Sequence, residues 1–312
     1  MTGQEDAVKQ MMLNLFTCLV ATVLLAASAN MGRAQGQAPP DHPVVTVHGQ
    51  TYSPGSILTR NMGTEEDQTK PFPPHAIVGN VYYVGTRTLS SFLVVTPRGN
   101  ILIDSTYERN VPVIQKSVEQ LGFKFSDIKI LLGNHAHGDH QEGDALVKQM
   151  TGAQVMAMAE DVPALRAIQP GGKEHPIDRI LHDRDGVTLG GTTLVAHLTA
   201  GHTRGGTTWT ARAQERGTTY DVVFFCSLRA GGAITPAIAE ELDHSFRVVR
   251  ALPCDVPLGD HPAQYNMHAK YARLQGGEPN PFIDKANCLA EVDIQEAMYH
   301  AVLDEQQKAP HP

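Results

Sequence analysis

Short apolar runs alternate with amphipathic segments along the chain from about residue 76 onwards. Runs rich in β-branched and aromatic residues, bounded by turn-forming residues, predict strands. Apolar residues spaced three and four positions apart predict helices. The expected strands cover residues 76–84, 90–96, 100–103, 128–132, 155–158, 192–199, 207–211 and 221–225. The expected helices cover residues 111–121, 145–150, 164–168, 238–252 and 285–306.

Strands and helices follow one another in both halves of the chain, and no low-complexity linker separates the halves. This order predicts a single α/β domain of two fused halves over residues 75–312. Residues 35–74 contain Pro, Gly and Thr and show only weak periodicity. For them we expect an N-terminal extended arm that lies on the domain.

An uncharged apolar run covers residues 11–29 and ends in Ala27-Ser28-Ala29, a small-x-small cleavage pattern. We therefore predict a signal peptide over residues 1–34, with cleavage near residues 29–34, and a periplasmic or secreted protein. An uncleaved N-terminal anchor is the alternative. No second hydrophobic stretch of spanning length follows, so we expect no stable membrane anchor.

The charge balance argues against one class of partner. The chain carries 33 acidic and 25 basic residues, for a net charge of -8, and no basic stripe. Binding to a phosphate backbone needs clustered Lys and Arg, so we expect no nucleic-acid partner. The 15 histidines in 312 residues are a high count and indicate where the chemistry lies.

A histidine-rich loop directly follows the strand expected at residues 128–132. His135, His137, Asp139 and His140 lie within six residues, and Gly138 allows the chain to bend sharply. Such a loop can direct two ligands to one side and two to the other, which suits two metal ions. Imidazoles with one carboxylate favour zinc over the oxygen-preferring ions. A polar surface loop is the alternative, but four ligand-type side chains at this spacing argue against it.

Two more turns after strands offer histidines. His202 stands in Gly201-His202-Thr203, and His261 stands in Gly259-Asp260-His261-Pro262. Each of these histidines, taken alone, is as consistent with a structural role as with a metal ligand. The remaining histidines lack such turns, and we interpret them as surface or packing residues.

Together these motifs resemble the metallo-β-lactamase superfamily, from about residue 78 to residue 289. The resemblance implies an α/β fold, an αβ/βα four-layer sandwich in which two facing mixed sheets carry helices outside and metals at one edge. It also implies two Zn²⁺ ions per chain, the first held by His135, His137 and His202 and the second by Asp139, His140 and His261.

The branch of the superfamily is indicated by the residues after the strand at 221–225. Many members that are not lactamases place a metal-bridging Asp there, but this chain continues with Cys226-Ser227-Leu228-Arg229. His140 and Ser227 instead resemble class B β-lactamases of the third subclass. The resemblance therefore implies a secreted zinc-dependent β-lactamase that hydrolyses the lactam amide with a metal-bound hydroxide and confers β-lactam resistance.

In this interpretation Asp139 is catalytic as well as a metal ligand, because it orients the nucleophile. We expect Ser227 and Arg229 to bind the carboxylate that β-lactam antibiotics carry, with Arg204 as a weaker candidate. Arg229 departs from the family pattern, where a second Ser is common, and a solvated or ion-paired Arg229 is the alternative.

Two other functions stay open at this point. One is a zinc-dependent lactonase or another hydrolase of the same superfamily, and the other is a non-catalytic zinc-binding secreted protein. The chain has neither a Gly-x-Ser-x-Gly elbow nor a Ser-x-x-Lys pair, so a covalent serine mechanism lacks its signature.

The family resemblance extends to Cys254 and a later Cys288. We predict a disulfide between them, since an exported protein meets oxidising conditions. Cys226 would then be a free thiol beside the site. Three buried thiols are the alternative.

Overall fold

The computed structural model describes residues 41–308. The predicted signal peptide lies outside the described residues, as do the last four residues of the chain. Among residues 41–308, no helix combines the length and the apolar character needed to cross a membrane.

Seven strands form the larger sheet, in the order β3-β4-β5-β6-β7-β8-β9. Pairing is antiparallel from β3 to β6 and parallel from β6 to β9, so the sheet is mixed. The strands are β3 (His75–Val78), β4 (Val81–Tyr83), β5 (Phe92–Thr96), β6 (Gly99–Ile103), β7 (Ile128–Leu132), β8 (Gln154–Met158) and β9 (Arg179–Leu181).

Five strands form the smaller sheet, in the order β10-β11-β12-β13-β14, and only the last pair is parallel. The strands are β10 (Gly186–Leu189), β11 (Thr192–Leu198), β12 (Thr207–Glu215), β13 (Thr218–Phe225) and β14 (Val256–Gly259).

The strand predicted at residues 76–84 is wrong in one respect, because it is divided into β3 and β4. Gly79 has a φ of 54°, and a Cβ there would lie 2.5 Å from the backbone oxygen of Gln214. A positive φ without a side chain allows the tight turn between the two strands. The strands β9 and β10 were not predicted, and β14 was implied only as the strand before the His261 turn, since three or four residues are too few to show a periodicity.

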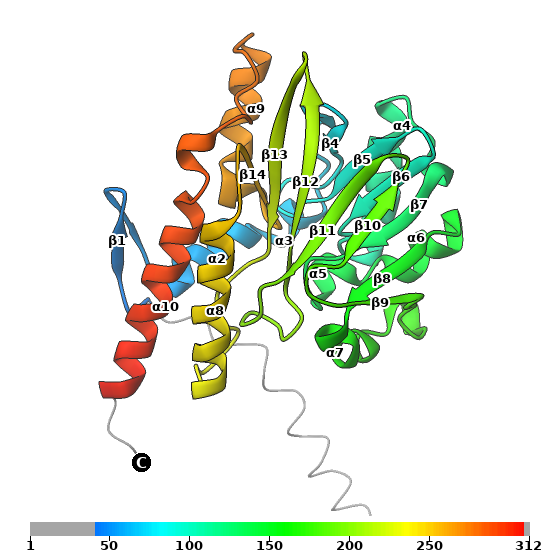
Figure 1. Cartoon of the computed structure of the whole chain (residues 1–312). Coiled ribbons are helices and arrows are strands. Elements are labelled where there is room, and N and C mark those ends of the chain that lie inside the picture. The colour runs from blue at the N-terminus through cyan, green and yellow to red at the C-terminus, as the bar shows by residue number, and fades with distance from the viewer. Residues whose placement is uncertain (1–40, 309–312) are drawn as a thin grey trace, which may run out of the picture. The chain divides into compact units, whose positions relative to one another are not determined.

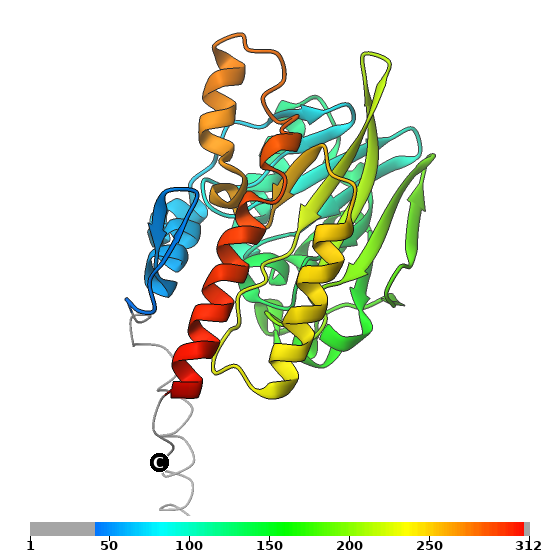
Figure 2. The same cartoon turned by 60° about the vertical axis from the view of Figure 1, so that its left-hand side comes forward.

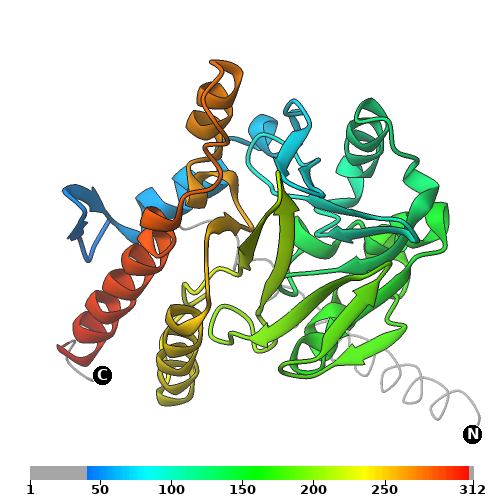
Figure 3. The same cartoon turned by 45° about the horizontal axis from the view of Figure 1, so that its top comes forward.

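The two sheets face each other, with helices on both outer faces (Figures 1 and 3). Helices α4 (Val111–Gln120) and α6 (Asp144–Thr151) cover the larger sheet, and α8 (Pro236–Ala251) and α10 (Ala290–Lys308) cover the smaller one. Alternate residues of one strand serve different layers: Val222 and Phe224 lie between the sheets, whereas Val223 packs under α8 and α10. The expected four-layer αβ/βα sandwich is confirmed.

The remaining helices are short. They are α2 (Pro54–Met62), α3 (Glu65–Thr69), α5 (Gly138–Gln141), α7 (Val162–Ala167) and α9 (Met267–Gln275).

The extended conformation expected for residues 35–74 is wrong for much of the described part. Strands β1 (Val45–Val47) and β2 (Gln50–Tyr52) form a hairpin, and α2 and α3 follow it. Figure 2 shows the hairpin beside α10. Both helices begin at capping boxes, in which the hydroxyls of Ser53 and Thr64 accept hydrogen bonds from backbone nitrogens of the first turn. Helix α2 buries Ile57 but has only nine residues, and α3 has five residues and buries none, which explains the weak sequence signal.

The predicted disulfide is present between Cys254 and Cys288, whose Cα atoms are 6.1 Å apart. It connects the chain just before β14 to the start of the C-terminal helical segment. Cys226 is a free, buried thiol, as expected.

Candidate metal centre

Three turns of the chain bring the six predicted ligands together. The loop after β7 carries His135 and His137 and runs into α5, which carries Asp139 and His140. The turn between β11 and β12 carries His202, and the turn after β14 carries His261. Possible ligand atoms lie within 4.8 Å of one another in three groups. Two of them are the predicted sets, one of His135, His137 and His202 and the other of Asp139, His140 and His261, and the third joins His135 and His140 to Asp260.

In the first group, which we call the three-histidine group, the rings stand nearly perpendicular to one another. The ring centroids of His135 and His137 are 4.8 Å apart, and both rings lie at similar distances, 4.5 and 4.7 Å, from the ring of His202. Three imidazoles around one point match the ligand set of a zinc ion that keeps an open position.

In the second group a carboxylate faces two imidazoles. Oδ2 of Asp139 lies 3.2 Å from Nε2 of His140 and 3.9 Å from Nε2 of His261. The centroids of the two rings are 5.1 Å apart. The loop that carries His135 and His137 continues directly into α5, which carries Asp139 and His140. The two ligand groups are therefore adjacent in space.

The ring nitrogens that point away from the groups have buried acceptors. Nδ1 of His202 donates to the carbonyl oxygen of Arg229 at 2.6 Å, and Nδ1 of His261 donates to that of Thr88 at 3.0 Å. Nδ1 of His140 donates to Oδ2 of Asp104 at 3.1 Å. Carbonyl and carboxylate oxygens only accept, so the proton is on Nδ1 and the lone pair on Nε2. Imidazoles oriented in this way are typical of metal sites.

Burial and charge suit a cation at this place. Nε2 of His140 is buried and has no hydrogen-bond partner among the described residues. Burial lowers the pKa of His202 well below its ordinary value and that of His135 to about 3, so both rings are neutral, the form that binds metal. Around His140 the carboxylates of Asp139 and Asp104 outweigh burial and raise its pKa, so a metal ion binding at Nε2 would displace a proton from this ring. The donor set therefore fits zinc.

The sequence interpretation missed three buried aspartates that hold these turns: Asp104, Asp161 and Asp260. Asp104 directly follows β6 and has a φ of 62°, a left-handed conformation that Asp tolerates. Its other oxygen accepts from the backbone nitrogen of Asn134 at 2.8 Å. A single carboxylate directly after an apolar strand, as in Ile103-Asp104 and Gly259-Asp260, was the available signal.

Asp161 ties the first turn to the second. Its carboxylate accepts from the backbone nitrogens of Ala136 and Gly205, at 2.9 and 2.7 Å, and from the hydroxyl of Thr203 at 2.8 Å. Gly205 approaches so closely that a Cβ there would lie 2.5 Å from the backbone nitrogen of Asp161. The loop of His135 and the turn of His202 are therefore held as one unit.

The hydroxyl of Ser227, an expected substrate contact, has partners within the protein. Ser227 is 6 % exposed, and its hydroxyl donates to Oδ1 of Asp260 at 3.0 Å while accepting from Nε2 of Gln264 at 2.9 Å. Ser227 therefore holds the buried carboxylate of Asp260, and its contact with substrate stays a prediction.

Arg229 is half-buried and its carbonyl oxygen contacts His202, whereas Arg204 is exposed in the His202 turn. Burial lowers the pKa of Arg229, an effect that the charges of Asp260 and Asp139 oppose. No ion pair of its guanidinium is found in residues 41–308, so the ion-paired alternative is not supported.

Cys226 lies beside the first group. Its Sγ is 3.7 Å from Nδ1 of His135 and 3.5 Å from the carbonyl oxygen of Asn134. Burial raises the pKa of the thiol well above its ordinary value, so the group stays a thiol and is a poor metal ligand.

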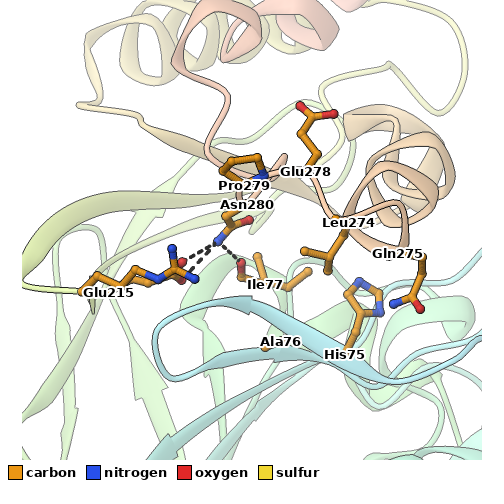
Figure 4. Close-up of a pocket in the computed structure, with 11 residues that line it drawn as sticks. His75, Ala76, Ile77, Glu215, Leu274, Gln275, Glu278, Pro279 and Asn280 are labelled. Atoms are coloured by element: carbon orange, nitrogen blue, oxygen red, sulfur yellow. Dashed lines mark hydrogen bonds between the residues drawn. The ribbon is translucent and has the colours of Figure 1, made fainter.

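A separate surface pocket of about 530 Å³ is lined by none of the predicted ligands. Figure 4 shows its lining, in which the side-chain amide of Asn280 donates to the carbonyl oxygen of Ile77 and to Glu215. The ligand-type residues of the chain thus gather elsewhere, at the three turns.

Known proteins match this fold. The model of the metallo-β-lactamase superfamily matches residues 84–256. Native FEZ-1 metallo-β-lactamase from Legionella gormanii is 42% identical with a TM-score of 0.74, and the match covers 77% of this chain and 99% of that chain. BJP-1, a subclass B3 enzyme of Bradyrhizobium japonicum, is 34% identical with a TM-score of 0.72, covering 78% and 98%. The class B3 di-zinc metallo-β-lactamase LRA-12, from an Alaskan soil metagenome, is 29% identical with a TM-score of 0.70, covering 76% and 96%.

The chain belongs to the metallo-β-lactamase superfamily, and it is an enzyme, a hydrolase of that family. The resemblance to the third subclass is confirmed as well, since its structural neighbours include enzymes of subclass B3.

Proposed function

We propose that this protein is a secreted β-lactamase that uses two Zn²⁺ ions to hydrolyse the lactam amide and confers β-lactam resistance. The observation that carries the proposal is the pair of adjacent ligand groups, three histidines on one side and Asp139, His140 and His261 on the other. The di-zinc enzyme among its neighbours supports the metal count, and the subclass B3 neighbours support the substrate.

Zinc bound at these groups would lower the pKa of a water to about 7, supplying hydroxide, and would polarise the lactam carbonyl. Asp139 would orient the nucleophile, because one of its carboxylate oxygens faces His140 and His261 and the other can accept a hydrogen bond. In the proposed reaction the same carboxylate would later pass a proton to the departing amide nitrogen.

Arg229 binds the carboxylate that lies next to the lactam nitrogen. A guanidinium can meet a carboxylate with two parallel hydrogen bonds. Because the hydroxyl of Ser227 donates to Asp260, we propose the half-buried Arg229 as the first candidate for this contact and Arg204 as the weaker one.

Export follows from the apolar run at residues 11–29 and its small-x-small end. N-terminal sequencing of the protein from a periplasmic fraction should give a start near residues 30–35. A full-length chain in the membrane fraction would favour the uncleaved anchor instead.

The decisive experiment compares substrates on one zinc-loaded preparation. A chromogenic cephalosporin should be hydrolysed, and an acyl-homoserine lactone should be turned over far more slowly. The reverse preference would support the lactonase, and bound zinc without turnover of either compound would support a zinc-binding protein. Expression in a susceptible bacterium should raise the inhibitory concentration of a β-lactam, and the His135→Ala variant should not.

A further inference from the structure

Asp260 is a fully buried carboxylate between β14 and the turn of His261. Its Oδ2 accepts from the backbone nitrogen of Ser227 at 2.8 Å, and its Oδ1 accepts from the hydroxyl of Ser227 at 3.0 Å. The same Oδ2 lies 3.4 Å from Nδ1 of His135. Both oxygens therefore face donors on neighbouring turns.

A buried carboxylate is costly unless donors surround it. Ser227 supplies two of them and holds the carboxylate in one position, and Nδ1 of His135 faces it at 3.4 Å. Because a carboxylate oxygen only accepts, its presence beside Nδ1 keeps the proton of the imidazole on that nitrogen. Nε2 of His135 then has its lone pair available within the three-histidine group.

We propose that Asp260 is a positioning residue, which fixes the tautomer and orientation of His135 and so strengthens metal binding by the three-histidine group. The proposal rests on the zinc binding in the proposed function and is independent of the substrate.

A competing partner for the same nitrogen is Cys226, whose Sγ lies 3.7 Å from Nδ1 of His135. A neutral thiol is a weak acceptor, whereas an anionic oxygen forms the stronger hydrogen bond and makes the imidazole a more basic ligand. The shorter distance and the negative charge both favour Asp260 as the orienting group.

Asp260 also acts on a second histidine through the backbone. It holds Ser227, the nitrogen of Leu228 donates to Oε1 of Gln295, and the carbonyl oxygen of Arg229 accepts from His202. Each residue of the segment 227–229 thus has at least one hydrogen-bond partner elsewhere in the chain. Loss of the Asp260 carboxylate would loosen the start of that segment, whose end orients His202.

The test measures zinc affinity in the full-length mature enzyme by competition with a chromophoric chelator, together with zinc content per chain. Asp260→Ala should weaken the first bound zinc by about 10- to 100-fold, as is typical of partners that orient a ligand. Asp260→Asn keeps an acceptor but loses the charge, and should weaken it by roughly threefold or more. Cys226→Ser is the matched control on the same nitrogen and should stay within about twofold of the wild type.

The absorption spectrum of the cobalt-substituted enzyme gives a second readout. It should change in the Asp260 variants, because the His135 ring is reoriented, and should be preserved in Cys226→Ser. If Asp260→Ala fails to fold, the zinc affinity of Asp260→Asn tests the proposal, provided that this variant has a native circular dichroism spectrum. Wild-type affinity in that variant, or a larger loss in Cys226→Ser, would overturn the proposal. Wild-type enzyme that binds zinc but hydrolyses no β-lactam contradicts only the proposed substrate.

Discussion

Nδ1 of His202 donates to the carbonyl oxygen of Arg229 at 2.6 Å. Arg229 therefore contributes to the candidate metal centre through its backbone as well as through its side chain. Its carbonyl oxygen orients His202, a predicted metal ligand, and its half-buried side chain is the proposed contact to substrate. Because any residue carries the carbonyl, substitution of the side chain separates the two roles.

Arg229→Ala should raise KM for a β-lactam several-fold with little change in kcat, because contact with the substrate carboxylate exists equally in the ground and transition states. Zinc content should be unchanged, since the carbonyl that accepts from His202 remains. Steady-state kinetics on an acid and its ester analogue give the check, and the effect should shrink for the ester. Equal losses for both would remove Arg229 from substrate binding and leave Arg204 as the candidate.

Single substitutions should remove zinc from one ligand group without removing it from the other. His261→Ala removes a ligand of the second group and should lower zinc content from two ions towards one, whereas His135→Ala should damage the three-histidine group. Elemental analysis of each variant measures the content. Prolonged chelation should abolish hydrolysis and added zinc should restore it. Full activity in a verified metal-free preparation would contradict the metal requirement.

Gly205→Ala should destabilise the fold by about 1–3 kcal/mol, the usual cost of overpacking. Its Cβ would stand 2.5 Å from the backbone nitrogen of Asp161 and force the His202 turn away from the His135 loop. Urea unfolding measures the stability. The control is Gly232→Ala, since a Cβ at Gly232 meets nothing within 4 Å, and this variant should unfold as the wild type does.

The Cys254–Cys288 disulfide closes a loop with a sequence separation of 34. In the chain-entropy model such a loop contributes about 4 kcal/mol to the free energy of unfolding. The double variant Cys254→Ala, Cys288→Ala should lose about that much in denaturant unfolding. Mass spectrometry of non-reduced peptides checks the pairing, and a bridge that contains Cys226 would contradict it.

His75 should make the protein less stable as the pH falls. Burial lowers its pKa to about 4 from an ordinary value of 6.5, and its ring packs among aromatic rings, including Tyr83 and Phe282. Between pH 6.5 and 4 the unfolded chain binds a proton that the native ring does not, so the stability contribution present above 6.5 is lost by up to about 3 kcal/mol.

Replacing His75 with a residue that does not titrate should make the free energy of unfolding depend less on pH. The free energy of unfolding of His75→Phe should fall less steeply than that of the wild type between pH 6.5 and 4. The exposed His244 offers the control, as His244→Phe should follow the wild-type curve. Parallel curves for the wild type and His75→Phe would rule out the proposed role of His75.

The amino-acid sequence by itself was enough to predict the features that depend on local spacing. Four ligand-type side chains within six residues, His135 to His140, define a metal loop wherever the rest of the chain lies. Strands β6 and β7 were predicted because burial on both faces makes each a short, nearly continuous apolar run. Helix α8 was predicted because burial on one face spaces its apolar residues three and four positions apart.

Only the tertiary structure decided the contacts between segments far apart in the chain. The helices of residues 54–69 depend on capping side chains and on packing of Ile57 against α10, which no local period reveals. The sequence interpretation treated Ser227 as a donor to substrate, but its partner, Asp260, stands 33 positions away. Hydrogen-bond partners across turns depend on where strands end in space. For that reason the aspartates that orient His135 and His140 were found in the structure and not in the sequence.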